Sequence, residues 1–369
     1  MAFHDIIGQD KAINIIVRTM QRGRIASSYL FAGEPGIGKK YTAVTLAKAL
    51  NCLTSLGDAC DECPSCKKID SGIHPDFLLI SPESGQIRIE EIRAIDEMLS
   101  LKAFEGRYKV VIVDDADTMN QYAANAFLKR LEEPPGESLI ILVSSNPARL
   151  PDTIRSRCSR INFTPLSSAA CEKVILSVLH QKPDASGDSS APGRIQGGEA
   201  GGKGKRPLKS KREDEKKRRG EESAKTSPLP DSLTLSLLIR LSMGSPGNAI
   251  TQDLIADRTW SLQLLKGMLN AEKDGWTSKE DMERWFDLIL ILLRDMAVFR
   301  ITGNESRLIN VDLKEYIGDM SSTTDIKVII ESYQRMNALK GYFGVHLNKS
   351  LTWNYTGSLL RKMMDVTNA

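Results

Sequence analysis

Apolar runs alternate with helical patterns over residues 1–165. Four short runs are almost wholly apolar, as buried parallel strands are, and they cover 28–32, 77–80, 109–113 and 139–143. Between them, apolar residues recur every three to four positions, as on one face of a helix. These helical segments cover 39–53, 87–101 and 122–133. The alternation predicts an α/β domain in which helices cover both faces of a parallel sheet.

The pattern changes after residue 165. Residues 182–228 are rich in Gly, Ser, Lys and Arg and contain almost nothing apolar. Such a segment cannot bury enough surface to offset the entropy of ordering it, so we expect a disordered insertion within a small helical lid over 166–252. Helical spacing continues over 253–369 and includes all four tryptophans. This last part is predicted to be an all-α domain with an aromatic core.

The net charge of +3 hides an uneven distribution. Residues 181–228 hold 13 Lys or Arg against 8 Asp or Glu, which leaves the remainder of the chain near −2. The folded part is therefore not expected to bind DNA through bulk charge. The basic insertion either contacts nucleic acid weakly or is a solvated linker, and we favour the linker.

No stretch of the sequence has the roughly 20 apolar residues that a membrane span needs. The most apolar run, Trp285–Leu293, contains Asp287 and reads as a buried helix. The first residues lack the pattern of a signal peptide. We therefore expect a cytoplasmic protein without membrane contact, in which the six cysteines do not form a disulfide framework.

A glycine-rich turn, residues 33–40, follows the first predicted strand and opens the first predicted helix. This is the context of a phosphate-binding P-loop. The residues expected to contact phosphate are Gly33, Gly36, Gly38 and Lys39. The next position should be Ser or Thr, whose hydroxyl binds Mg²⁺, but it is Lys40. Thr42 points elsewhere on a helix, so the loop is predicted to form while ATP/Mg²⁺ binding at this site is doubtful.

Two acids end the third predicted strand. Asp114 would hold Mg²⁺, and Asp115 stands where P-loop ATPases usually have a glutamate that orients the attacking water. Aspartate is one methylene shorter, which misplaces a base that must lie within about 3 Å of its target. The alternative is a strand that ends in solvated acids. The P-loop upstream favours a vestigial nucleotide site.

Four cysteines follow the predicted P-loop helix with the spacing C-x7-C-x2-C-x2-C. They are Cys52, Cys60, Cys63 and Cys66. Four thiolates can close a tetrahedral Zn²⁺ site that leaves no position for water, which favours a structural metal over a catalytic one. The alternative of four buried free cysteines fits poorly, because the intervening residues are too polar for a core.

These motifs together resemble the bacterial clamp-loader family of AAA+ ATPases. The resembling stretches are residues 3–9, the cysteine segment, 124–135, 144–147 and 153–158. The resemblance implies an AAA+ nucleotide-binding domain over 1–165 with a zinc knob at 52–66. It further implies a lid over 166–252 and a collar domain for oligomerisation over 253–369. Ser145 takes the sensor-1 position.

In this family, subunits of the DNA polymerase III holoenzyme place a sliding clamp on primed DNA. The resemblance implies delta and gamma/tau subunits as partners, and a trans-acting arginine finger at Arg157. An arginine at this place could instead pair only with a carboxylate. Lys40, together with the lack of arginine in the sensor-2 segment 244–249, favours a member without autonomous ATPase activity.

Two other readings remain open. The first is an active ATP-hydrolysing gamma/tau-type subunit, which the intact glycines, Lys39 and Asp114 support. The second is a zinc-containing nucleic-acid-binding module that contacts DNA through the basic insertion.

Overall fold

The computed structural model describes residues 2–82, 85–180, 232–272, 275–343 and 347–365. They form two compact units. Unit 1 comprises the described residues of Met1–Glu34, Gly38–Thr164 and Leu176–Ser232, and unit 2 those of Pro35–Ile37, Pro165–Ile175 and Leu233–Ala369. Each unit is described by itself below. The predicted disordered insertion at 182–228 lies outside the described residues.

Unit 1 is built on a five-stranded parallel sheet with the strand order β2-β3-β4-β1-β5. The strands are β1 (Ser28–Ala32), β2 (Phe77–Ile80), β3 (Lys109–Val113), β4 (Ser138–Ser144) and β5 (Ser159–Asn162). Every residue of β1, β3 and β4 is buried. Because both faces of these strands are covered, their sequences are continuous apolar runs and do not alternate.

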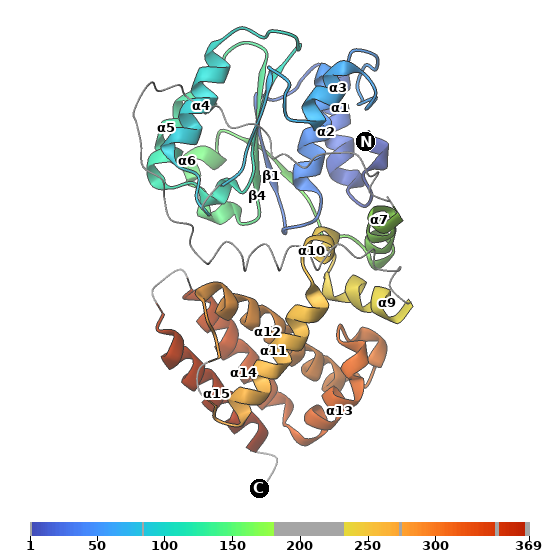
Figure 1. Cartoon of the computed structure of the whole chain (residues 1–369), viewed down its shortest axis with the longest axis vertical. Helices are drawn as coiled ribbons and strands as arrows, with labels where there is room; N and C mark the ends of the chain where they lie inside the picture. Colours follow the sequence, from blue (N-terminus) through green and yellow to red (C-terminus); the bar gives the residue numbers. More distant parts are fainter. Residues whose placement is uncertain (1, 83–84, 181–231, 273–274, 344–346, 366–369) are drawn as a thin grey trace, which may run out of the picture. The chain divides into compact units, whose positions relative to one another are not determined.

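Helices cover both faces of the sheet in unit 1 (Figure 1). One side carries α4 (Ile89–Ser100), α5 (Gln121–Glu132) and α6 (Asp152–Arg155), and the other carries α1 (Asp10–Gln21), α2 (Lys39–Asn51) and α3 (Pro64–Asp70). Short 3-10 helices lie at η1 (Phe3–Asp5), η2 (Ala116–Thr118) and η3 (Pro147–Arg149). The predicted α/β architecture, a parallel sheet with flanking helices, is confirmed.

The regular elements of unit 2 are all helices among its described residues. Its helices are α7 (Ser168–His180, shared with unit 1), α9 (Ser232–Leu241), α10 (Pro246–Thr251), α11 (Leu254–Leu269), α12 (Lys279–Thr302), α13 (Lys314–Thr323), α14 (Ile326–Gly341) and α15 (Lys349–Asp365), with 3-10 turns η4 (Glu305–Arg307) and η5 (Val311–Leu313). Trp276 lies at the centre of an aromatic cluster, with ring centroids 5.5 Å from Trp285 and 5.0 Å from Trp353. The expected aromatic core is therefore present. The division of this unit into lid and collar stays a prediction.

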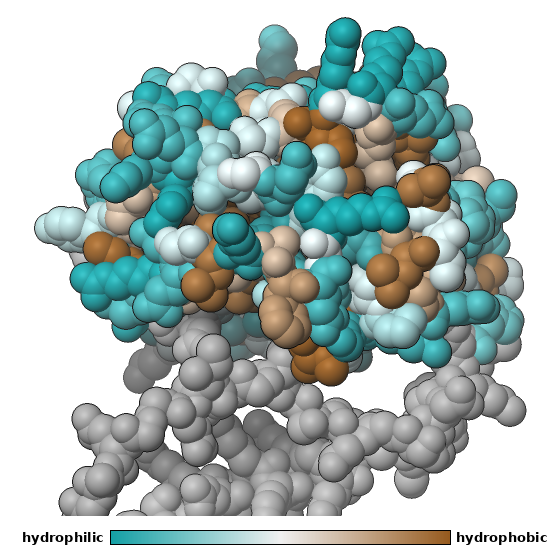
Figure 2. Space-filling model, turned by 90° about the horizontal axis from the view of Figure 1, so that it is seen from above, coloured by the Kyte–Doolittle hydropathy of each residue, from teal (hydrophilic) through white to brown (hydrophobic). Residues whose placement is uncertain are grey.

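Within the described residues, none of the helices combines the length and the apolar character required to cross a membrane. The apolar run Trp285–Leu293 lies inside α12, where Trp285 and Phe286 are fully buried. Figure 2 shows one face of the molecule, on which apolar side chains are scattered among hydrophilic ones.

Candidate functional site

The glycine-rich turn connects β1 to α2, as the sequence predicts. Gly38 is the N-cap of α2 and has a φ of 96°, and Gly36 has a φ of 73°. Both values lie in the left-handed region that favours glycine. Gly36 belongs to unit 2, and within this unit a Cβ at Gly36 would lie 2.6 Å from Asn248 Oδ1. The backbone N–H of Gly247 donates to Gly36 O at 2.9 Å.

Lys39 is buried, and its ammonium group is held by the loop itself. Nζ donates to the carbonyl oxygens of Gly33 at 2.6 Å and Glu34 at 2.5 Å, and lies 3.4 Å from Ser145 Oγ. Burial lowers the pKa of Lys39, against the opposing effect of the nearby carboxylates, of which Asp114 is the strongest. The lysine expected to reach a phosphate therefore satisfies its hydrogen bonds within the protein.

Lys40 forms an ion pair with the acid that would hold a metal. Its Nζ lies 3.0 Å from Asp114 Oδ2, and the Asp114 side chain is only 16% exposed. The Thr42 hydroxyl, the nearest alternative metal ligand in the sequence, instead donates to Gly38 O at 2.9 Å. The residues at these two positions thus do not fit Mg²⁺, because an ammonium group lies on the carboxylate that would bind it and the Thr42 hydroxyl is bonded to the loop.

Asp115 has a left-handed backbone with a φ of 46°. Burial raises the pKa of its carboxyl group, and the negative charges of Asp114 and Asp117 raise it further. Asp117 was not singled out in the sequence, yet its Oδ1 accepts hydrogen bonds from Ser144 Oγ at 2.7 Å and Ser145 N at 3.1 Å. It therefore fixes the end of β4 beside the P-loop. In the sequence, the position of Asp117 three residues after Asp114 was the one feature that placed it near this site.

Arg157 lies just after α6 and makes two contacts within unit 1. Nη2 lies 2.5 Å from Glu132 Oε1, and Nη1 donates to Thr153 O at 2.8 Å. The side chain is 35% exposed and its partner Glu132 is 48% exposed. The carboxylate pairing considered as an alternative is present, and the pair is open to solvent.

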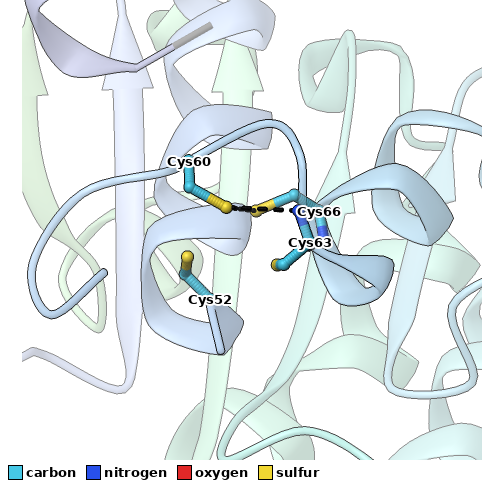
Figure 3. A group of neighbouring side chains, drawn as sticks. All are labelled: Cys52, Cys60, Cys63 and Cys66. Atoms are coloured by element: carbon cyan, nitrogen blue, oxygen red, sulfur yellow. Dashed lines mark hydrogen bonds between the residues drawn. The ribbon is translucent and has the colours of Figure 1, made fainter. Parts of the chain in front are cut away.

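The four cysteines predicted to bind a metal come together at the carboxyl end of α2. Cys52 is the C-cap of α2, Cys60 lies in the following loop, and Cys63 caps α3, which carries Cys66 (Figure 3). Their four Sγ atoms all lie within 4.8 Å of one another, and Cys60 is the one member that is partly exposed. A tetrahedral zinc site has sulfur atoms about 3.8 Å apart, from Zn–S bonds of about 2.3 Å.

Backbone N–H groups point at these sulfur atoms. Cys63 N donates to Cys60 Sγ at 3.3 Å, and Cys66 N donates to Cys63 Sγ at 3.4 Å. Hydrogen bonds from the Thr54 hydroxyl and from backbone N–H groups lower the pKa of Cys60 to about 6. Burial raises the pKa of Cys66, which a bound metal would overcome by deprotonating the thiol. Thiol donors in this arrangement fit a structural zinc ion.

The other cysteines and His74 have packing roles. Cys171 is fully buried, and burial raises the pKa of Cys158 to about 12. His74 is buried between Ser65 Oγ, 3.2 Å from Nε2, and the N–H of Asp76, which donates to Nδ1 at 3.1 Å.

Comparison with known proteins points to one family. Residues 8–167 match the family described as DNA polymerase III, delta subunit. Over 164 residues, 44% of this chain and 50% of the relative, the sequence is 38% identical to DNA polymerase III subunit delta' of Bacillus subtilis. It is 40% identical over 152 residues, 40% of this chain and 46% of the relative, to subunit delta' of Pseudomonas aeruginosa.

A related similarity is to DNA polymerase III subunit tau/gamma of Haemophilus influenzae, 32% identical over 49% of this chain and 26% of that protein. The chain thus spans about half or less of the length of these curated relatives. The fold and the loop define an α/β domain with a glycine-rich turn of the P-loop type between β1 and α2. Over less than half of its length, the chain is similar to the delta' and tau/gamma subunits of DNA polymerase III.

Proposed function

We propose that this chain is a delta-prime-type clamp-loader subunit that hydrolyses little or no ATP and assists a neighbouring ATPase subunit. The observation that carries the proposal is the ion pair of Lys40 with Asp114, 3.0 Å apart, where an ATPase needs Mg²⁺. Two delta' subunits are 38–40% identical to 40–44% of this chain.

The rest of the site supports an inactive nucleotide pocket. Lys39 is bound to the carbonyl oxygens of its own loop, so phosphate would have to replace these contacts. Asp115 is shorter than the glutamate that usually positions water. Catalysis of phosphoryl transfer depends almost wholly on positioning and charge stabilisation, and both are weakened here.

Arg157 is proposed as the residue that acts on the neighbour. Its partner Glu132 lies on α5 and is half exposed, so the pair can separate without uncovering a buried charge. A phosphate group of an adjacent ATP site would then replace Glu132 as the partner of the guanidinium. The proposed partners are delta and gamma/tau subunits, the sliding clamp and primed DNA. The four cysteines are proposed to hold a structural zinc ion.

The test is the ATPase rate of a clamp loader reconstituted with Arg157→Ala. An arginine finger is worth about 10³–10⁵ in rate, so turnover at the one site that it serves should be almost abolished. Arg160→Ala is the matched control, because Arg160 is exposed nearby and bonds only to Asn162 among the contacts described. Assembly, measured by sedimentation, should be equal for all three proteins. Wild-type turnover in an assembled Arg157→Ala complex would contradict the proposal.

A further inference from the structure

Lys48 is a buried charged residue that borders the cysteine knob, which we define as Cys52–Asp70. Its side chain is only 4% exposed, although lysine is rarely buried unless it is paired. Lys48 lies on α2 four residues before Cys52, and residues with this spacing share one face of a helix. The ammonium group therefore lies on the side of α2 from which the first thiol emerges.

Two carboxylates from separate segments of the knob bind this ammonium group. Asp61 Oδ1 pairs with Lys48 Nζ, and the Asp70 carboxylate lies 3.0 Å from the same nitrogen. Asp61 stands between Cys60 and Cys63, and Asp70 is the last residue of α3. One lysine thus joins the three chain segments that supply the four sulfur atoms: the end of α2, the loop and α3.

The loop needs such a support because of its backbone. Asp61 has a φ of 59°, in the left-handed region that most non-glycine residues avoid. Asp61 lies between Cys60 and Cys63, which belong to the same group of four cysteines (Figure 3). A charge-assisted hydrogen bond from Lys48 stabilises Asp61 in that conformation.

We infer that Lys48 is the positioning residue of the four-cysteine site, through its salt bridges to Asp61 and Asp70, and that it slows the loss of the bound metal. Lys48 does not touch the metal. It holds the ligand-bearing segments at their mutual distances, as outer-shell partners do in metal sites. The inference rests on the proposed structural zinc.

The experiment measures Zn²⁺ release from the full-length chain to a chromogenic chelator. Loss of an outer-shell partner typically costs 10–100-fold in metal affinity, so Lys48→Met should release zinc at least tenfold faster than wild type, while Lys48→Arg should retain most of the wild-type rate. Lys68→Met is the matched control. Lys68 also forms a salt bridge, with Glu105 at 2.6 Å, but it lies at the surface and its partner is outside the knob.

A second variant covers the case in which Lys48→Met does not fold. Asp61→Asn removes the charge of the partner that is 31% exposed, leaves no cavity, and should also speed release. Circular dichroism gives the folded fraction of each variant, and the ligand-field spectrum of the Co²⁺-loaded protein reports whether four thiolates still bind. Release rates of Lys48→Met and Asp61→Asn within twofold of wild type would overturn the inference. A wild-type chain that binds no zinc would overturn it together with the zinc proposal, whereas the Arg157 experiment would stand independently.

Discussion

The two ends of α2 carry two sites that differ in completeness. At its amino end the P-loop has its glycines and Lys39, but Lys40 replaces the hydroxyl residue and pairs with Asp114. At its carboxyl end, Cys52 and three further thiols converge within 4.8 Å, with N–H groups directed at the sulfur atoms. The comparison shows that the glycine-rich loop and its helix form without the hydroxyl residue after Lys39, while four thiols gather at the opposite end of the same helix.

The largest expected effect, on bound zinc and on the stability of unit 1, follows from removing one thiol at the carboxyl end of α2. Cys66→Ser should reduce bound zinc from about one per chain to almost none, because a structural site requires all four thiolates. A ligand at about 1,000 times its dissociation constant stabilises a fold by about 4 kcal/mol. At about 2–4 °C per kcal/mol for a unit of this size, the melting temperature of unit 1 should fall by about 8–16 °C. Metal analysis and circular dichroism measure the two effects.

Cys158→Ser is the control for this variant, because Cys158 lies in the same unit but outside the four-thiol group. It should retain zinc. Equal zinc content in wild type and Cys66→Ser would show that the thiols are not a metal site and would remove the contrast between the two ends of α2.

A smaller loss of stability is expected from replacing Asp76, which lies directly before β2. The Asp76 carboxylate, 1% exposed, accepts N–H groups from Phe104 at 2.9 Å and from Glu105 and Gly106 at 2.7 Å. Hydrogen bonds to a charged group contribute about 1.5–3 kcal/mol, so Asp76→Asn should destabilise unit 1 by about 2–3 kcal/mol. Denaturant unfolding followed by far-UV circular dichroism measures this loss.

The same variant has a predicted pH dependence. Burial acts to raise the pKa of Asp76, but the three N–H groups outweigh it and hold the pKa below its usual 3.8. A lowered pKa contributes stability above the unfolded value, and this contribution is lost as the pH falls through the folded value. The stability difference between wild type and Asp76→Asn should therefore be constant near neutral pH and shrink below about pH 3.8. A difference that grows in acid would contradict this assignment.

Asp312→Asn distinguishes the two units. Asp312 pairs with Arg258 in unit 2, and that hydrogen bond lowers its pKa. All four tryptophans lie in unit 2, so their fluorescence should report the loss of stability in Asp312→Asn and not in Asp76→Asn. A tryptophan signal that shifts equally in both variants would mean that the units unfold together.

Features encoded locally were predictable from the sequence. The apolar runs placed β1, β2 and β3 at their observed bounds and β4 within one residue at each end, since continuous apolar stretches in this context have few alternatives. The glycines placed the P-loop, and the spacing of the cysteines placed the knob. Each of these signals is contained in a short segment.

Features that depend on distant pairing were missed. The edge strand β5 was not predicted, because only Ile161 of its residues is buried and its sequence lacks an apolar run. The contacts of Lys48 with Asp61 and Asp70 span 13 and 22 residues. The hydrogen bonds from the backbone N–H groups of residues 104–106 to the Asp76 carboxylate span up to 30 residues. No periodicity encodes such pairs, since they arise only once the chain has folded.

The most direct test of the account is equilibrium binding of fluorescently labelled ATP to the purified chain, with and without Mg²⁺. Lys40→Thr restores a hydroxyl at the metal position and frees Asp114, so it should gain Mg²⁺-dependent affinity of at least tenfold, or about 1.4 kcal/mol. The wild-type chain should bind ATP weakly and with no response to Mg²⁺. Tight, Mg²⁺-dependent binding by wild type that is abolished in Lys39→Ala would contradict the account and identify an active ATPase subunit.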